Sequence, residues 1–317
     1  MSLKFGIQIE PQFGFDYQTI EKIALKAEVL GYTSIWSSDH FFLDLNSESR
    51  NCMEAWTLIA ALASRTTKLR LGTLVTCNSY RYPAILAKIA ASVDHISKGR
   101  LEFGIGAGWK EIEYNAYGIP FPSVKDRMDQ LEEAIQIIKQ LWTEPKVTFE
   151  GKQFRVKDAF SAPKPIQNLP PIFIGGTGKK RILRMVAQYA DYCNFGWFNP
   201  PEKLKDLLET LRDHCKTINR DYDSVGKSFF ASVMIGESSE ELEQLILQRA
   251  QMRKMTVDEY RNSIGMGTFL GTPEIIIQQF QELINLGFDY FQIMFPYPND
   301  YEQSIKFAQH VLPKLKL

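Results

Sequence analysis

Residues 33–42 read Thr33-Ser34-Ile35-Trp36-Ser37-Ser38-Asp39-His40-Phe41-Phe42, and the chain changes character half-way along this stretch. Its first four residues form a short run with strand propensity, which predicts a buried strand. An acid and an imidazole follow directly, and α/β folds keep their functional side chains at the carboxyl ends of strands. Asp39 and His40 are therefore candidate site residues. On this stretch alone, a helix-capping Asp beside a surface His is an equally good interpretation.

The strand-then-helix rhythm repeats along the rest of the chain. Strands are predicted at 3–9, 33–37, 69–76, 101–105, 172–174, 192–195, 229–235 and 290–294. Helix boundaries lie between them: Asp16 and Ser123 fit N-caps, Gly31 fits a C-terminal stop, and Pro83 and Pro273 fit first helical positions. Eight strands alternating with about eight helices favour a closed parallel (β/α)8 TIM barrel, an α/β fold, over an open sheet.

Two stretches interrupt the rhythm and are predicted to be insertions in a single barrel domain spanning residues 1–317. Residues 144–171 contain a predicted hairpin around Glu150-Gly151, followed by a Pro-rich return. Residues 237–268 are predicted to be helical. The insertions therefore follow the fourth and seventh predicted strands.

Composition narrows the function. Lys+Arg and Asp+Glu both number 37, so no net field recruits nucleic acid or an anionic membrane. The four cysteines show no C-x-x-C pair and are predicted to be reduced thiols. No His is spaced with a second ligand, so no metal site is expected. The N-terminus shows no signal-peptide pattern and no long apolar run occurs. We therefore expect a soluble, cytoplasmic protein that acts on a small molecule.

Four strand ends carry candidate site residues. They are Asp39-His40, the run from Thr73 to Asn78, the run from Gly104 to Trp109, and Gly175-Gly176-Thr177-Gly178. Glycines at strand ends allow a flat or anionic ligand to approach the backbone closely. Gly104-x-Gly106-x-Gly108 does not match the dinucleotide fingerprint, and a flat ring against this backbone is the preferred interpretation.

The run Gly175–Gly178 directly precedes a predicted helix. Its amides and the helix dipole would face a phosphate, and Lys179, Lys180 and Arg181 add positive charge. A plain Gly-rich turn followed by solvated basic residues is the alternative.

The chain resembles the luciferase-like monooxygenase superfamily. The resemblance rests on several motifs along most of its length: residues 36–41, Leu71-Gly72-Thr73-Leu74-Val75-Thr76, Arg81-Tyr82-Pro83, residues 94–101 (Asp-His-Ile-Ser-Lys-Gly-Arg-Leu), residues 104–109 and Ile174-Gly175-Gly176. Among its branches, the chain looks most like the one that uses the deazaflavin coenzyme F420. The resemblance implies a (β/α)8 barrel that usually pairs as a homodimer.

The resemblance also implies roles for individual residues. A bulge with a non-proline cis peptide at Thr73-Leu74 would support the cofactor ring, and His40 would be catalytic in proton transfer. The residues implied to bind the cofactor are Asp39, Thr73, Leu74, Thr76, Asn78, Gly106, Ala107, Gly108, Gly175, Gly176, Thr177 and Gly178. The family's sugar-phosphate dehydrogenases have a Glu directly after the Gly-x-Gly loop, where this chain has Trp109. This difference argues against the same alcohol-oxidising reaction.

Three functions remain open. The first is an oxidoreductase that transfers a hydride between F420 and a small organic substrate. The second is an FMN-dependent monooxygenase that takes reduced flavin from a partner reductase and uses oxygen. The third is a non-catalytic flavin- or deazaflavin-binding barrel. A Schiff-base aldolase is disfavoured because no strand end carries a Lys. Specificity is expected from the two insertions and from the aromatic residues Trp36, Phe41, Trp109, Trp197 and Phe198.

Overall fold

A computed structural model describes residues 2–196, 199–264, 267–298 and 300–315. Eight parallel strands pair in the order β9-β11-β1-β2-β3-β4-β7-β8, and β8 pairs back with β9, which closes the barrel. The strands are β1 (Lys4–Ile9), β2 (Ser34–Ser37), β3 (Arg70–Cys77), β4 (Leu101–Gly106), β7 (Ile172–Gly175), β8 (Tyr192–Gly196), β9 (Gly226–Ile235) and β11 (Tyr290–Met294). The predicted TIM barrel is confirmed.

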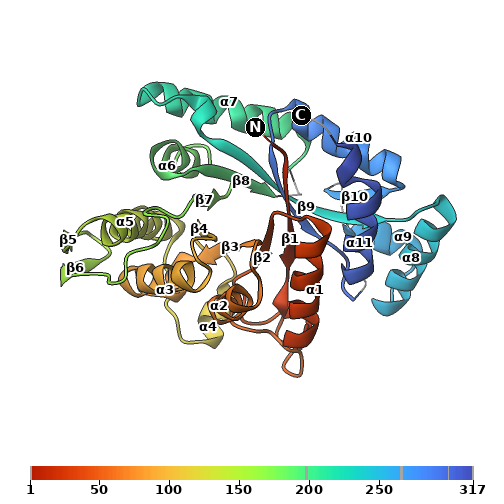
Figure 1. Cartoon of the computed structure of the whole chain (residues 1–317), viewed down its shortest axis with the longest axis horizontal. Helices are drawn as coiled ribbons and strands as arrows, with labels where there is room; N and C mark the ends of the chain where they lie inside the picture. The colour runs from red at the N-terminus through yellow and green to blue at the C-terminus, as the bar shows by residue number, and fades with distance from the viewer. Residues whose placement is uncertain (1, 197–198, 265–266, 299, 316–317) are drawn as a thin grey trace.

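Helices surround the barrel (Figure 1). They are α1 (Tyr17–Leu30), α2 (Ala55–Arg65), α3 (Pro83–Ile96), α5 (Val124–Thr143), α6 (Ile182–Tyr189), α7 (Pro201–Thr217), α10 (Pro273–Asn285) and α11 (Asp300–His310). Asp16 and Ser123 cap α1 and α5 as predicted, because their side chains accept the amides of Thr19 and Asp126. Short 3-10 turns lie at η1 (Pro11–Phe13), η2 (Asn78–Tyr80), η3 (Tyr222–Ser224) and η4 (Leu312–Lys314).

Apolar side chains fill both faces of the barrel wall. One large cluster lies between strands and helices, and a smaller one made of Trp36, Leu74, Phe173 and Tyr290 fills the interior. Trp36 is fully buried against Phe173, with ring centroids 4.9 Å apart, so this tryptophan is core and does not line a substrate site. The Phe173 and Tyr290 rings also pack against each other, with centroids 5.7 Å apart.

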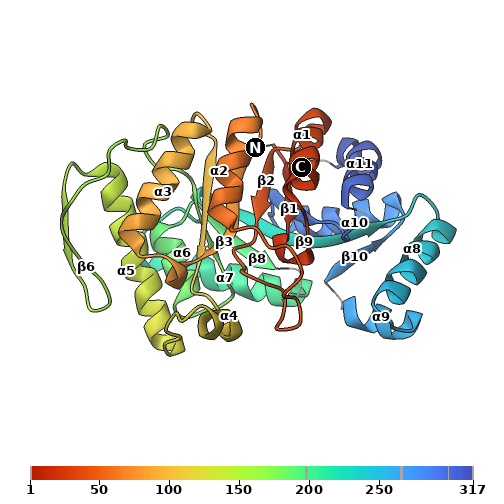
Figure 2. The same cartoon turned by 90° about the horizontal axis from the view of Figure 1, so that it is seen from below.

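The two insertions lie at opposite ends of the molecule, as Figures 1 and 2 both show. The first contains the predicted hairpin, β5 (Val147–Glu150) antiparallel to β6 (Arg155–Ala159). The second contains α8 (Ser239–Met252) and α9 (Val257–Ile264), but it ends in a strand, β10 (Thr268–Gly271), which pairs parallel with β9. Helices α8 and α9 fit the helical prediction for residues 237–268. Strand β10, which starts at the last residue of that range, was not predicted, because four residues are too few to show an alternating pattern and pairing with β9 decides their conformation.

One further helix, after Trp109, was not predicted from the sequence. Residues Glu111–Ala116 form helix α4, whose six residues are too few for a helical periodicity to be recognised. All four cysteines are unbridged, as expected. In the part of the chain that the structure describes, every helix is too short or too polar to cross a membrane.

Candidate active site

His40 lies just beyond the carboxyl end of β2, where its imidazole meets a carboxylate from α4. Nδ1 of His40 is 2.9 Å from Oε2 of Glu113. The Glu113 carboxylate is completely buried, whereas the His40 side chain is 20% exposed. The pair therefore has one end fixed in the protein and the other reachable from solvent.

Glu113 joins the loop after β2 to the loop after β4. Its Oε1 accepts the amides of Phe41 (2.8 Å) and Phe42 (3.2 Å) and the ammonium of Lys110 (3.1 Å), and its Oε2 also accepts the Tyr80 hydroxyl (2.6 Å). Burial opposes ionisation, but these hydrogen bonds and the neighbouring His40 outweigh it and lower the pKa of Glu113 to about 2. Glu113 is thus a fixed anion.

This anion decides which imidazole nitrogen carries the proton. An ionised carboxylate only accepts hydrogen bonds, so Nδ1 of His40 must be the donor. In the neutral ring Nε2 is then a lone-pair acceptor, and it has no hydrogen-bond partner among residues 2–196, 199–264, 267–298 and 300–315. An imidazole held in this way can take up a proton at Nε2, and the resulting cation is stabilised by Glu113.

Asp39, the other residue of the predicted pair, points into a second ion-pair group. Its carboxylate receives both Nη atoms of Arg81, at 2.7 and 2.9 Å, and the amide of Cys77 at 2.9 Å. Arg81 also pairs with Glu54. Asp39 is therefore not a helix cap: it ties the end of β2 to the end of β3.

Strand β3 carries the bulge implied by the family resemblance. The β3–β4 register shifts between Thr73 and Thr76, and a non-proline cis peptide joins Leu74 to Val75. The cis bond lies one residue later than the implied Thr73-Leu74 position. The Thr73 and Thr76 hydroxyls hydrogen-bond each other at 2.5 Å, and Trp56 Nε1 of α2 donates to Thr76. Both threonine side chains are thus engaged by the barrel wall.

The glycines at the neighbouring strand ends accommodate a protein side chain. A Cβ built on Gly104, Gly106 or Gly175 would lie 3.2, 2.7 or 3.1 Å from a Val75 methyl. Val75 therefore lies beside Gly106 and Gly175, and a Cβ on Gly104 would also meet the Thr73 carbonyl at 2.0 Å. A flat ring against this backbone stays a prediction. Gly108 has φ +76, and a Cβ there would lie 2.0 Å from Oη of Tyr114, so this glycine is required by the turn and by the tyrosine below it.

Asn78 follows β3 directly and is fully buried. Neither its Oδ1 nor its Nδ2 has a hydrogen-bond partner in the part of the chain that the structure describes. A buried amide without partners costs about 1–3 kcal/mol, which makes such a group unusual unless a ligand satisfies it. A planar ring with a carbonyl next to an N–H, such as the pyrimidine edge of a flavin or deazaflavin, offers the complementary donor and acceptor.

The predicted phosphate cradle, Gly175–Gly178, lies between β7 and α6. The Gly176 amide bonds to the carbonyl of Asn194 (3.2 Å). The amides of Thr177 and Gly178 have no acceptor within the described ranges, so they remain available to an anion. Helix α6 starts only at Ile182, four residues beyond the cradle.

Two of the three basic residues after the cradle form ion pairs with carboxylates of other helices. Lys179 pairs with Asp206 of α7, and Arg181 pairs with Asp129 of α5 at 2.5 Å. Lys180 is exposed and has no ion-pair partner among the described residues. The predicted positive charge around the cradle is thus smaller than the sequence indicated.

Three residues with a possible role in the site were not predicted from the sequence. Glu113 is absent from the predicted site residues, and Arg81 appears only in the Arg81-Tyr82-Pro83 motif. Glu10, directly after β1, is buried and accepts the side-chain amides of Gln8 (2.8 Å) and Gln12 (2.5 Å), with no ion-pair partner among the residues that the structure describes. The position of Glu10 directly after a predicted strand could have marked it as a candidate site residue. Trp197 and Phe198, expected to contribute to specificity, lie outside the described residues.

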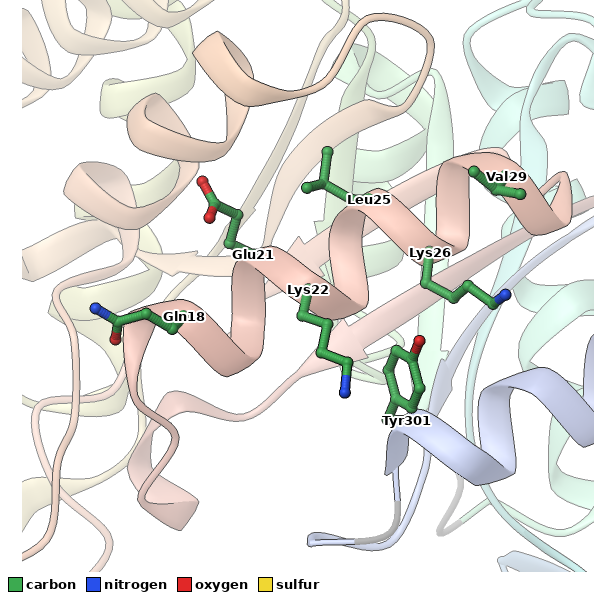
Figure 3. A pocket seen from close by; sticks show the side chains of 7 residues that line it. All are labelled: Gln18, Glu21, Lys22, Leu25, Lys26, Val29 and Tyr301. Atoms are coloured by element: carbon green, nitrogen blue, oxygen red, sulfur yellow. The ribbon is translucent and has the colours of Figure 1, made fainter.

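A surface hollow on the outside of the barrel contains none of these residues. It is lined by Gln18, Glu21, Lys22, Leu25, Lys26 and Val29 of α1 and by Tyr301 of α11 (Figure 3). Lys22 lies over the Tyr301 ring, 4.2 Å from its centroid. The candidate chemistry therefore remains at the strand ends.

Residues 3–290 match the sequence profile of the luciferase-like monooxygenases. The chain belongs to this family. An F420-dependent glucose-6-phosphate dehydrogenase of Amycolatopsis mediterranei is 25% identical over 99% of both chains. One of Kineococcus radiotolerans is 35% identical over 59% of this chain and 54% of its own length.

Solved structures of two kinds share the fold of this family member. An F420-dependent secondary alcohol dehydrogenase in complex with an F420-acetone adduct superposes with a TM-score of 0.84, at 21% identity and full coverage of both chains. The oxygenating constituent of 3,6-diketocamphane monooxygenase from Pseudomonas putida, in complex with FMN, superposes with a TM-score of 0.80 at 17% identity, again over both whole chains. Fold similarity therefore fits either cofactor.

Proposed function

We propose that this luciferase-like protein is an oxidoreductase that transfers a hydride between coenzyme F420 and a small organic substrate. The observation that supports this most directly is the His40–Glu113 pair, a proton-handling imidazole with Nδ1 fixed and Nε2 available. F420-dependent dehydrogenases among the relatives support the choice of cofactor.

The chain's residues fit such a cofactor at two places. The unpartnered Asn78 amide suits the pyrimidine edge of the ring, and the amides of Thr177 and Gly178 suit its phosphate. The Leu74-Val75 bulge, Gly106 and Ala107 lie on neighbouring strands between these places, and we propose them, with Asp39, as the surround of the ring. The hydride chemistry is supplied by the cofactor, at C5 of the deazaflavin.

His40 supplies the proton chemistry of the proposed reaction. Because Trp109 stands where the sugar-phosphate dehydrogenases have their acid, the proposed reaction relies on His40 with Glu113 instead. When an alcohol is oxidised, Nε2 accepts the hydroxyl proton as the carbinol carbon loses its hydride. The imidazolium formed is held by Glu113, which stays ionised because its pKa is lowered to about 2. In the opposite direction the same imidazolium returns the proton to a carbonyl oxygen.

A binding and turnover experiment tests the proposal. Purified protein is titrated with oxidised F420 and, separately, with FMN, and substrate consumption is then measured with and without oxygen. We expect tight binding of F420 and turnover that does not need oxygen. Tight binding of FMN alone, with oxygen-dependent substrate consumption, would instead establish the monooxygenase alternative, and binding without any turnover would establish a non-catalytic barrel.

We also propose that the protein is a cytoplasmic homodimer and that a separate reductase regenerates the reduced cofactor. The family resemblance supports the dimer and the need to recycle the cofactor. Light scattering on the purified protein tests the dimer.

A further inference from the structure

Trp109 presents a large indole to solvent beside the candidate catalytic imidazole. Its side chain is 71% exposed, and its ring meets the His40 ring edge-on, with centroids 5.7 Å apart and an interplanar angle of 82°. What sets this tryptophan apart from the other exposed apolar side chains is its contact with the candidate catalytic imidazole, where a large flat ring offers a binding surface.

The base of Trp109 is fixed. Gly108 is held at φ +76 above Tyr114, which is fully buried and shares a hydrogen bond of 3.0 Å with the Cys77 thiol. Helix α4 begins two residues after the tryptophan, at Glu111. The indole is therefore presented from a rigid turn, and a rigid aromatic surface binds with little loss of side-chain entropy.

The charges around this surface are already paired. Lys110 is bound to the Phe42 carbonyl and to Glu113, and Arg81 is bound to both Asp39 and Glu54. Neither cation is free to receive a phosphate or carboxylate next to His40. A charged substrate placed there would lose hydration without gaining an ion pair.

Further aromatic rings gather around Phe41, the residue after His40. Phe41 is stacked between Tyr80 and Tyr117, with centroid distances of 4.4 and 4.2 Å, and Tyr117 is 58% exposed. The ring that the structure places directly against the His40 imidazole is therefore Trp109, and the neighbouring Phe41 belongs to a stack of aromatic rings.

We propose that Trp109 is a specificity-determining residue and that the substrate is an uncharged, largely apolar alcohol or its ketone, bound against the indole. This inference rests on the proposed function and adds its substrate class. In the oxidising direction the hydroxyl proton goes to Nε2 of His40, the hydride leaves the carbinol carbon for F420, and a C=O bond forms. One alcohol and one oxidised cofactor give one ketone, the anion of the reduced cofactor and one proton, which His40 holds.

The experiment compares an uncharged with an anionic alcohol. Cyclohexanol and glucose 6-phosphate are assayed with F420 for the wild type and for Trp109→Ala, Trp109→Phe and Phe160→Ala. Phe160 is the matched control, because it is 68% exposed and lies directly after the β5–β6 hairpin at one end of the molecule. Binding of cyclohexanone to the protein–F420 complex is measured independently by saturation-transfer NMR.

We expect the wild type to prefer cyclohexanol. Trp109→Ala should lower kcat/KM for cyclohexanol on the order of 10-fold or more, mainly through KM, and weaken the NMR signal of cyclohexanone. Trp109→Phe should retain most of the activity, and Phe160→Ala all of it. F420 affinity should be the same in all four proteins.

Other outcomes overturn the inference. A wild type that prefers glucose 6-phosphate, a Trp109→Ala variant with unchanged KM for cyclohexanol, or a protein that binds F420 but oxidises neither alcohol each contradicts it. A wild type that does not bind F420 contradicts the proposed function itself, so the two failures are distinguishable.

Discussion

Among single residues, Glu113 combines two tasks that are usually separate. It holds the imidazole of His40 by Nδ1, and it also fixes the backbone on which that imidazole stands, through the amides of Phe41 and Phe42. A single carboxylate thus sets both the proton position on the ring and the place of the ring in space.

Glu113→Gln should separate chemistry from cofactor binding. Its amide cannot stabilise an imidazolium as the carboxylate does, so we expect kcat to fall by about 100-fold or more, with F420 affinity unchanged. Steady-state kinetics and an F420 titration measure the two effects.

Glu111→Gln is the control for this change, because Glu111 is an exposed acid on the same short helix. Combining Glu113→Gln with His40→Ala should cause little further loss beyond His40→Ala, since both act on one proton transfer. Fully multiplicative losses would show that Glu113 does not act through His40.

Replacing Asn78 is expected to stabilise the unliganded protein and to weaken cofactor binding. Asn78→Leu removes a buried amide without partners, so the unliganded protein should gain about 1 kcal/mol in unfolding free energy, while affinity for F420 falls about 10-fold. Urea unfolding and cofactor titration are the measurements.

Asn194→Leu is the contrasting variant. Asn194 is also buried, but its Nδ2 donates to Ser228 (3.0 Å) and Gln292 (3.2 Å), so its replacement leaves acceptors unpaired and should destabilise the protein. Equal destabilisation by both substitutions would mean that Asn78 is satisfied within the free protein.

At the scale of elements, strands β3, β4 and β7 fit together through one side chain. Val75 occupies space that Gly106 of β4 and Gly175 of β7 leave open, whereas a Cβ on Gly104 would first meet the Thr73 carbonyl at 2.0 Å. The barrel wall is therefore continuous at the point where the bulge of β3 interrupts its register with β4.

Gly106→Ala tests this arrangement, because the new methyl would lie 2.7 Å from Val75 Cγ2. We expect a loss of about 1–3 kcal/mol in unfolding free energy from overpacking. In the double variant with Val75→Ala the space is restored, so the loss should be smaller than the sum of the single losses. Strict additivity would show that the two side chains do not compete for one space.

At the scale of the whole molecule, three carboxyl groups predict how stability depends on pH. Glu28 accepts the amides of Lys68, Leu69 and Thr67, and these bonds outweigh burial and lower its pKa to about 2, as in Glu113. Burial raises the pKa of Asp300 to about 6. The lowered groups stabilise the fold above the unfolded pKa of 4.5, and this stabilisation is lost as the pH falls towards 2.

Asp300 has the opposite effect on how stability changes with pH. Because its folded pKa exceeds the unfolded value of 3.8, stability falls as the pH rises from 3.8 to about 6. We therefore expect these groups to give a stability maximum near about pH 4. Urea unfolding across this range should show the fall above the maximum disappear in Asp300→Asn and the fall below it weaken in Glu28→Gln. Unchanged profiles would contradict the assignment.

Much of this architecture could be predicted from sequence, and the reasons differ by element. The eight barrel strands and the caps at Asp16 and Ser123 depend on local pattern, which the chain shows clearly. Helix α4 and strand β10 are short and depend on tertiary contacts, so no local sequence pattern predicts them. The position of His40 was predictable, but its partner Glu113 lies 73 residues away and only the folded chain brings them together.

The fluorescence of the exposed Trp109 indole can report on the state of the neighbouring His40. Of the four tryptophans that the structure describes, Trp36, Trp56 and Trp142 are at most 3% exposed, so red-shifted, iodide-quenchable emission from this group comes from Trp109. A protonated imidazole quenches indole emission more strongly than a neutral one. The quantum yield of Trp109 should therefore follow the charge on His40 without an added label, in the free protein and while the site is in use.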